Sequence, residues 1–329
     1  MEQQIEKVEA EVEVEVEESP RVQRLNVNKV KKTMKPLEKK GLIFAALMLL
    51  IPFINFLIFW VGVNANSIAL AFTSVDEVTQ KEVFSFYQFE KLFKDLSSPY
   101  NQAGRALINT LQYFGLHIIK LFLSVGIAYF FYKKVPGHTI YKILFFLPAM
   151  VPSMVYINVF KQLVSKYGPV YTLVDEVFGY KMPNLFAKSS TASPTILFYV
   201  LWSGFGASLL IFVGAMNRIP GEVIDAANLD GCGMAREFAQ IVMPLIWETF
   251  STYLLLAVAG LFTESGPFLY FVGADPNSEI YTLSYWIFAQ VNGGSYNYPA
   301  AIGLFFTVLG LPLVFISRWL MNKVETVTY

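Results

Sequence analysis

The amino-acid sequence contains about six apolar stretches, each close to the roughly 20 residues with which an α-helix crosses about 30 Å of hydrocarbon. These stretches cover residues 41–63, 107–132, 140–163, 194–216, 248–272 and 299–320. Hydrophobic residues make up 55% of the 329 residues, more than a soluble globular chain of this length carries. The sequence therefore predicts an all-α polytopic membrane protein with about six transmembrane helices.

Charge and cysteine content narrow the possible functions. The 25 basic and 25 acidic residues give a formal net charge of zero, so no global electrostatic argument favours nucleic acid as a partner. Cys232 is the only cysteine in the sequence, which excludes an internal disulfide and a metal site built from cysteines. We expect Cys232 to be a buried or partly buried structural thiol.

Residues 1–40 form a tail, first acidic and then basic, that precedes a transmembrane domain of residues 41–329. Glutamate and valine alternate near its start, but repeated like charges oppose strand pairing and the apolar content is too low for a core. We expect this start to be disordered, with a regulatory or docking tail as the alternative. No small-residue cleavage pattern follows the first apolar stretch, so we expect an uncleaved anchor.

Basic residues near the ends of the apolar stretches predict the orientation, because lysine and arginine are retained on the cytoplasmic side. Eight of them lie in residues 21–40, Lys133, Lys134 and Lys142 lie between the second and third stretches, and none lies between Glu237 and Ser317. Both termini are therefore predicted to be cytoplasmic in a multi-pass protein. The loop before the last stretch, which is acidic, is predicted to lie outside.

The segment of residues 219–246 is a polar interruption between two apolar stretches, on the predicted cytoplasmic side. It reads as two short helices with a glycine joint: Pro220 suits a first helical turn, and Glu222 and Asp225 face the positive end of the helix dipole. Gly231 and Gly233 can end the first helix and reverse the chain. Small and acidic side chains then offer a surface on which a basic partner can approach the backbone closely.

Asp225-Ala226-Ala227, followed at fixed spacing by Gly231, Ile241 and Pro244, resembles the EAA loop of ATP-binding-cassette import permeases. Asp225 stands where that family has glutamate, and Met243 stands where it has leucine; the second change nearly conserves volume. The ATPase-coupling residues implied by the resemblance are Glu222, Asp225, Ala226, Ala227, Asp230 and Gly231. The loop is then expected to form a coupling helix between spans four and five of a type I importer permease.

Further stretches are similar to the carbohydrate-importing branch, the relatives of the maltose permease, with a weaker likeness to permeases for oligosaccharides or polysaccharide fragments. They are Arg218-Ile219-Pro220, Leu229-Asp230-Gly231, Asn109-Thr110-Leu111, Gly168-Pro169-Val170-Tyr171 and Thr282 to Phe288. The resemblance implies a bacterial-type cytoplasmic membrane, a second homologous permease in a heterodimer, two ATPase subunits and an extracytoplasmic solute-binding protein, with a carbohydrate as substrate. ATP and magnesium are expected on the ATPase, since the sequence has no phosphate-binding glycine-lysine loop, and no bond chemistry is expected here.

Two ionisable residues stand inside the apolar stretches, Lys120 near the middle of the second and Glu264 in the outer half of the fifth. A charge at the centre of a membrane helix costs on the order of 3 kcal/mol, so such residues are usually kept for a reason. Ser265-Gly266-Pro267 predicts a helix break, which is tolerated where backbone lines a water-filled cavity. The predicted substrate-pathway residues are Lys120, Phe262, Glu264, Phe268 and Tyr270.

Alternatives stay open for these residues. Glu264 could reach outer solvent among interfacial aromatics, and Lys120 could contact the partner permease or snorkel; a sharper hypothesis pairs Lys120 with Glu264. His117 is expected to be a packed polar residue, and Pro148 and Pro152 are expected to be kinks.

Two other classes of protein compete with an importer permease. A secondary transporter or channel not coupled to ATP would favour inverted repeats and more intramembrane charge, which the sequence lacks. A membrane-embedded enzyme would need paired carboxylates, a His/Cys cluster or a nucleophile motif at the end of a span. None of these occurs at the end of a predicted span together with the partner residues that a catalytic site needs.

Overall fold

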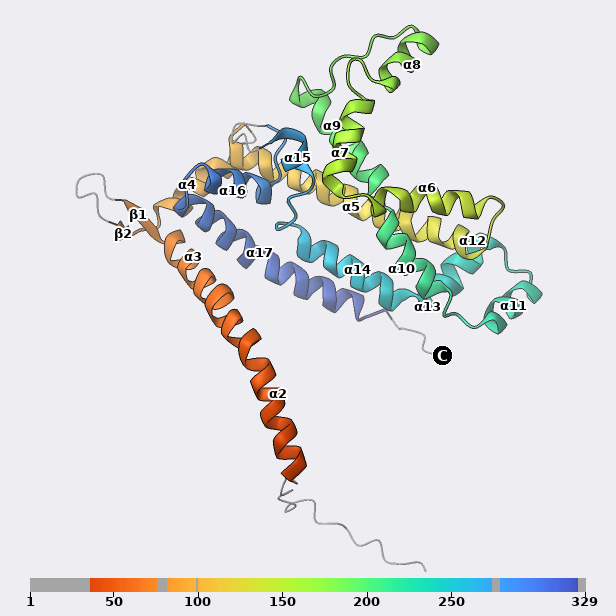
Figure 1. Cartoon of the computed structure of the whole chain (residues 1–329), viewed down its shortest axis with the longest axis horizontal. Coiled ribbons are helices and arrows are strands. Elements are labelled where there is room, and N and C mark those ends of the chain that lie inside the picture. The colour runs from red at the N-terminus through yellow and green to blue at the C-terminus, as the bar shows by residue number, and fades with distance from the viewer. Residues whose placement is uncertain (1–35, 76–81, 99, 274–278, 325–329) are drawn as a thin grey trace, which may run out of the picture. The chain divides into compact units, whose positions relative to one another are not determined.

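A computed structural model describes residues 36–75, 82–98, 100–273 and 279–324. The chain divides into two compact units, Met1–Gly62 and Val63–Tyr329. The predicted tail lies outside the described residues up to residue 35. Figure 1 shows the elements.

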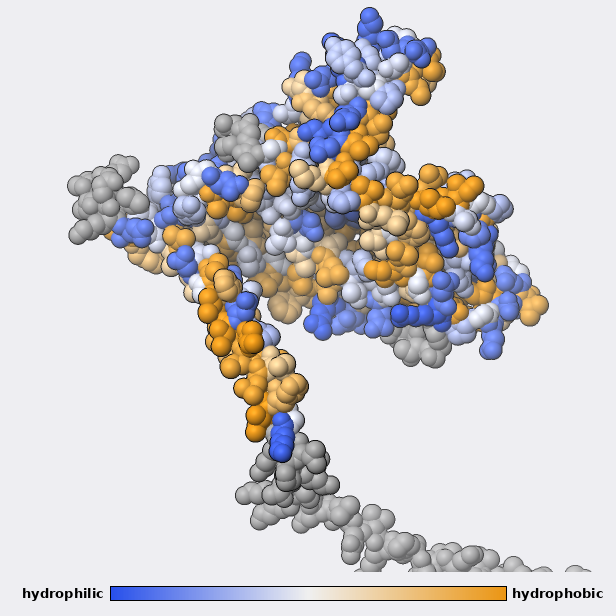
Figure 2. Space-filling view, in the orientation of Figure 1, coloured by the Kyte–Doolittle hydropathy of each residue, from blue (hydrophilic) through white to orange (hydrophobic). Residues whose placement is uncertain are grey.

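The described part of the first unit is helical. It consists of α2 (Pro36–Asn55) and a π-helix, η1 (Phe56–Gly62). The side chains of α2 from Lys40 onward are exposed and mostly apolar, as the hydrophobic colouring of this helix in Figure 2 shows. A helix that is apolar all round suits lipid, because water would oppose such exposure.

The described part of the second unit is helical apart from two short strands. Strands β1 (Thr73–Val75) and β2 (Glu82–Phe84) pair antiparallel, which the all-α prediction did not include. The helices before the last three are α3 (Val63–Ala71), α4 (Tyr87–Leu96), α5 (Gln102–Tyr132), α6 (His138–Met150), α7 (Ser153–Leu163), α8 (Pro169–Phe178), α9 (Ser189–Ser203), α10 (Gly206–Met216), α11 (Gly221–Leu229), α12 (Met234–Glu237), η2 (Phe238–Val242), α13 (Met243–Leu245) and α14 (Trp247–Gly260). The last three are α15 (Phe268–Val272), α16 (Leu283–Asn292) and α17 (Asn297–Met321).

Within the described residues, four helices are long and apolar enough to cross a membrane, and up to six spans result if each of two bent helix pairs is one span. The first pair, α6 and α7, bends by 110° where Pro152 caps α7, so the predicted kink is a full break. The second pair, Met234–Leu245 and Trp247–Gly260, bends by 76°. Proline lacks an N–H and clashes with the preceding turn, which explains the first break.

The predicted fifth span of residues 248–272 differs from the structure. Its helix, α14, ends at Gly260, and α15 begins only at Phe268. Between them Gly266 has φ +62, in the left-handed region that favours glycine. The predicted helix break is therefore confirmed, but the C-terminal part of this stretch is not a continuation of the same helix.

Helix α5 lies at the centre of the second unit. Its first half packs in an apolar cluster with α7, α9, α15, α16 and α17, and its second half packs in another cluster with α10, α14 and the segment from α11 to η2. In Figure 1, α5 runs alongside α10 and α14 in its second half and alongside α16 in its first half. A movement of α5 would therefore reach both ends of the unit.

We expect Gly206→Ala to destabilise the protein, because α10 passes close to α6 at this glycine. A Cβ at Gly206 would lie 2.4 Å from the Cβ of Ala149. Such overpacking costs roughly 1–3 kcal/mol. The matched control is Gly214→Ala on the same helix, where a Cβ would meet nothing within 4 Å. The melting temperature in detergent should fall for Gly206→Ala and not for Gly214→Ala. Equal melting temperatures of the two variants would contradict the close contact.

Candidate functional site

Helix α11 is anchored by one face and exposed on the other. Ile224 and Ala227 are buried, 8% and 6% exposed, and Ile224 packs in the cluster that also holds Val242 of η2. Their spacing of three residues places them on one side of the helix. Of the six predicted coupling residues, Glu222, Asp225, Ala226, Asp230 and Gly231 are exposed. Ala227, predicted for the contact surface, thus faces inward, whereas the other predicted residues of this loop are accessible.

The ends of α11 are set by proline and glycine. Pro220 is the N-cap and precedes the helix, where the sequence predicted it inside the first turn. At the other end, Cys232 N–H donates to the carbonyl of Ala227 at 2.9 Å and Gly231 N–H donates to that of Asn228 at 3.1 Å. These two bonds form a Schellman motif, whose turning residue Gly231 has φ +70. The predicted glycine joint is confirmed.

The thiol of Cys232 lies just beyond this joint. It is partly buried, as expected, and is not part of a disulfide. Its Sγ lies 3.9 Å from the carbonyl oxygen of Gly233, which caps the start of α12 in an extended conformation. α11 and α12 are therefore two short helices held by a defined turn.

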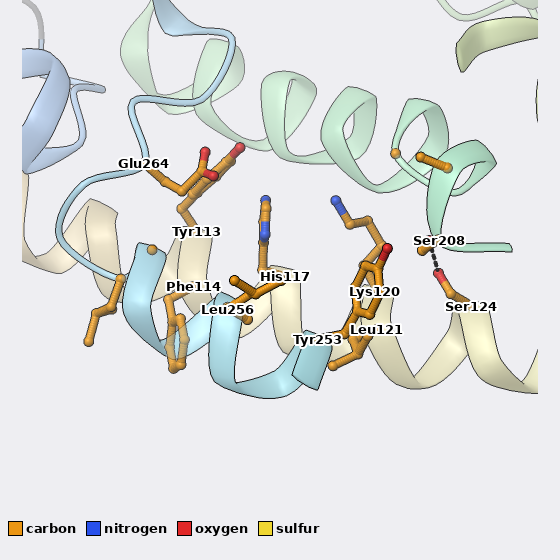
Figure 3. Close-up of a pocket in the computed structure, with 15 residues that line it drawn as sticks. Tyr113, Phe114, His117, Lys120, Leu121, Ser124, Ser208, Tyr253, Leu256 and Glu264 are labelled. Carbon is orange, nitrogen blue, oxygen red and sulfur yellow. Dashed lines mark hydrogen bonds between the residues drawn. The ribbon is translucent and has the colours of Figure 1, made fainter. Parts of the chain in front are cut away.

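A cavity of about 270 Å³ lies in the membrane-spanning part of the second unit. Its wall combines α5, the start of α10 and α14 with the segment that follows it; the polar and aromatic lining residues are Tyr113, Phe114, His117, Lys120, Ser124, Ser208, Tyr253 and Glu264. In Figure 3, side chains from α5 and from the segment after α14 gather along one side of this space. Hydroxyl, imidazole, amine and carboxylate groups thus face one chamber beside aromatic rings.

The α5 residues in the cavity follow helical periodicity. Tyr113, His117, Lys120 and Ser124 are spaced by four, three and four residues, which places them on one face. The rings of Tyr113 and His117 lie 4.7 Å apart between centroids, and Ser208 of α10 donates a hydrogen bond to Ser124 at 3.0 Å. His117, expected to be a packed polar residue, is therefore part of the cavity wall.

Lys120 and Glu264 line the same cavity but form no direct ion pair. Ion pairs among the described residues, within 4.0 Å, are Arg105–Glu279 and Lys133–Glu237. Figure 3 shows His117 between the Lys120 and Glu264 side chains. The predicted partnership is thus one of shared location in this conformation.

Two glycines give these charged side chains room. A Cβ on Gly204 would lie 2.7 Å from Lys120 Nζ, and a Cβ on Gly260 would lie 3.0 Å from the Cγ of Glu264. The Lys120 amine therefore crosses close above the junction of α9 and α10. The carboxylate arm folds back over the last turn of α14, where Glu264 N–H donates to the Gly260 carbonyl at 2.9 Å.

Three predicted pathway residues do not line this cavity. Phe262 packs on Phe306 at 4.8 Å between ring centroids, and Phe268 is buried. Tyr270 is exposed on α15, where its carbonyl oxygen lies 3.5 Å from Lys161 Nζ. Phe268 instead packs against the cavity residue Tyr113, with ring centroids 5.8 Å apart.

Two of the family-like sequence stretches meet in the structure. The Asn109 side-chain amide donates to the carbonyls of Glu279 and Tyr281, both at 2.9 Å. The Thr110 hydroxyl accepts from Leu283 N–H at 2.8 Å. These bonds tie the N-terminal end of α5 to the segment that leads into α16, and they explain why a polar pair stands at the start of an apolar stretch.

Residues 120–326 match the family described as binding-protein-dependent transport system inner membrane component. The chain is 25% identical over 212 residues to the multiple sugar-binding transport system permease protein MsmF of Streptococcus mutans, covering 63% of this chain and 71% of that protein. It is 26% identical over 148 residues to the maltose/maltodextrin transport system permease protein MalF of Escherichia coli (strain K12), covering 43% of this chain but 29% of that protein.

Solved structures extend the comparison to the fold. A chain of the bacterial alginate ABC transporter in complex with an alginate pentasaccharide-bound periplasmic protein superposes with a TM-score of 0.73. The match covers 89% of this chain and 98% of that chain, at 20% sequence identity. A chain of a second structure, of a bacterial ABC transporter involved in the import of the acidic polysaccharide alginate, gives a TM-score of 0.72.

Proposed function

The chain belongs to the family of binding-protein-dependent transport system inner membrane components, and we propose that it is the permease subunit of an ATP-driven importer for a carbohydrate, most specifically an oligosaccharide. The chain itself carries out no bond chemistry in this proposal. ATP and magnesium bind to a separate ATPase, and closure of two ATPase subunits drives alternating access of the cavity.

The single observation that carries the proposal is that α11 has one buried face and one exposed face. Its inner face is fixed by Ile224 and Ala227, while the exposed face presents Asp225, Ala226 and Asp230 beside a glycine turn. A short rigid helix with small and acidic side chains fits a cleft with basic groups, because it brings carboxylates close without bulky neighbours. We propose the ATPase as the protein that supplies this cleft.

The composition of the cavity supports a polyhydroxylated solute. Sugars offer hydroxyl groups for hydrogen bonds and apolar ring faces for aromatic contact, and the cavity offers Ser124, His117 and Glu264 beside Tyr113 and Tyr253. Relatives named for multiple sugars and for maltose point to the same class of solute. We propose Lys120 and Glu264 as solute contacts and a second homologous permease as the other half of the pathway.

The remaining partner is an extracytoplasmic solute-binding protein. The family description names binding-protein dependence, and a structurally similar importer was solved with a periplasmic protein bound to alginate pentasaccharide. In our proposal both termini and α11 are cytoplasmic, and the segment from Glu279 to α16 faces the binding protein in a bacterial-type cytoplasmic membrane. The retention of basic residues near the predicted cytoplasmic ends supports this orientation.

The test is reconstitution of this chain with the partner permease, the ATPase and the binding protein encoded by neighbouring genes. The permease pair, the ATPase and the binding protein should co-purify and take up oligosaccharide in proteoliposomes, and vanadate should stop uptake together with ATP hydrolysis. Uptake that continues without ATP, or that is driven by an ion gradient, would instead support a secondary transporter or channel. A ligand screen of the binding protein would identify the solute.

We expect Lys120→Gln and Glu264→Gln each to raise the solute concentration for half-maximal uptake by about tenfold or more, because each removes a charged hydrogen-bonding group worth roughly 1.5–3 kcal/mol. ATP hydrolysis by the assembled complex should persist. Tyr270→Phe is the control, since Tyr270 lies outside the cavity lining. Unchanged uptake curves for both cavity variants would contradict a solute contact there.

A further inference from the structure

A charged cluster lies apart from both the cavity and the exposed face of α11. Glu237, the last residue of α12, is 1% exposed, and Lys133 Nζ donates to both of its carboxylate oxygens at 3.0 Å. The Tyr129 hydroxyl donates to Oε1 of Glu237 at 3.0 Å and lies 3.1 Å from the Met234 carbonyl oxygen. The carboxylate therefore has three short polar contacts, all made by the cytoplasmic end of α5.

Such a cluster fixes geometry more than it adds stability. A buried charge is tolerated only when it is paired and hydrogen-bonded, and a buried ion pair often contributes no more stability than apolar residues of the same volume. Its contacts are directional, however, so the two helices cannot slide past each other as two apolar faces can. The apolar contact of Ile224 with its cluster lacks that constraint.

The cluster joins the segment after α11 to the helix that lines the cavity. α12 follows the glycine joint directly, and the Tyr129 ring packs on Phe238 at 5.0 Å between centroids. Lys120 stands on the same continuous helix as Tyr129, about 20 Å from Lys133 at 1.5 Å per residue. The outer end of that helix is held at Asn109 and Thr110. Helix α5 thus connects α12 of the cytoplasmic loop, the cavity and the segment that leads into α16.

The covalent route from α11 to the cavity is less direct. Between α12 and α14 the chain passes through the π-helical turn η2 and a 76° bend. Single π-turns and bends are places where a helix changes direction or yields. Along the chain, a displacement of α11 reaches α14 through that irregular segment, whereas α12, directly after the glycine joint, contacts α5 through three polar contacts.

We propose that Glu237, held by Lys133 and Tyr129, is the positioning residue through which movement of α11 is transmitted to α5 and so to the cavity. This inference rests on the proposed function, since it assumes that an ATPase moves α11. Glu237 itself touches neither ATPase nor solute. Its carboxylate keeps the loop and α5 moving as one body.

The experiment measures solute uptake and ATP hydrolysis together in proteoliposomes that hold the complete transporter. Glu237→Gln keeps the side-chain shape but removes the charge, and we expect the solute transported per ATP to fall by about tenfold, within the range of ordinary coupling between sites. ATP hydrolysis should remain. A merely structural loss would reduce the folded complex and lower both rates together, leaving their ratio unchanged.

Two further variants keep the test decisive. Tyr129→Phe preserves the ring and the ion pair and removes only the hydroxyl, so we expect a smaller fall in the same ratio in a well-folded complex. Exchanging the charges, Lys133→Glu with Glu237→Lys, should recover part of the ratio lost in either single change. Glu248→Gln is the control, because Glu248 is exposed at the start of α14.

The inference and the proposed function fail in different ways. A wild-type ratio in both Glu237→Gln and Tyr129→Phe, in complexes that bind the ATPase, would overturn the inference and leave the importer intact. If the unaltered chain bound no ATPase at all, the proposed function would be overturned and the inference with it.

Discussion

Gly231→Val should nearly abolish ATP-driven uptake while leaving the permease inserted in the membrane. Gly231 has φ +70, which is strained for any residue with a Cβ and most strained for a β-branched one. A Cβ there would meet nothing within 4 Å, so backbone conformation alone is disturbed. The Schellman turn would open and α11 would lose its fixed direction. A strain of about 1–2 kcal/mol lowers the population with the closed turn by roughly 5- to 30-fold, and more for a β-branched residue, and uptake should fall with it.

The matched control is Gly233→Val, two residues along the chain. Gly233 has φ −72 and ψ 158, an extended conformation that valine adopts readily, and a Cβ there also meets nothing within 4 Å. Uptake in proteoliposomes should therefore stay near the unaltered value. Equal uptake by the two variants would show that the left-handed turn does not set the position of α11.

Asp225→Lys should remove ATPase binding together with uptake. Asp225 is exposed on α11 and forms no ion pair among the described residues, so the change leaves the fold of this chain intact. At an interface with a basic cleft, placing like charges together costs several kcal/mol, which corresponds to a loss of affinity of about 100-fold or more. Co-purification of the ATPase and its dissociation constant for the permease are the measurements.

Asp225→Glu is the informative companion to that variant. It introduces the glutamate that the EAA loop of import permeases carries and lengthens the side chain by one methylene. We therefore expect binding at least as tight as in the unaltered chain. Wild-type affinity of Asp225→Lys for the ATPase would place this carboxylate outside the interface. Loss of binding in both variants would point to shape, not charge, as the deciding property.

Local sequence signals predicted the parts of the structure that depend on local physics. A kink at Pro152, which the structure shows as a full break, a helix break at Gly266 and the glycine joint at Gly231 follow from φ preferences and the missing proline N–H. The end of α14 at Gly260 did not follow, because an apolar stretch continues to Val272 and hydropathy does not distinguish one helix from two.

Only some of the cavity residues could be predicted from the sequence. Lys120 and Glu264 stood out because a charge is costly in a membrane, and both line it. Tyr113, His117 and Ser124 could have been found from their helical spacing with Lys120. The contributions of α10 and α14 had no such signal, since they depend on how the helices pack.

The Lys133–Glu237 pair shows the same limit more clearly. The two residues lie 104 positions apart, and neither has a local pattern that names the other. Glu237 in a single sequence reads as one more acid in a polar loop. Its burial follows only from the packing of α12 against the end of α5.

The central claim, that the exposed face of α11 docks on an ATPase, is tested most directly by site-specific cross-linking. Cys232→Ser removes the sole cysteine, and Leu229→Cys then places a thiol on α11 where the side chain is 89% exposed. Tyr100→Cys, at a side chain 84% exposed just before α5, is the control on the predicted outer side. We predict that a maleimide carrying a photoreactive benzophenone, attached to the introduced thiol and then irradiated, links Leu229→Cys, but not Tyr100→Cys, to the ATPase. Absence of that product in an assembled, transporting complex, or a cross-link from Tyr100→Cys alone, would contradict the account.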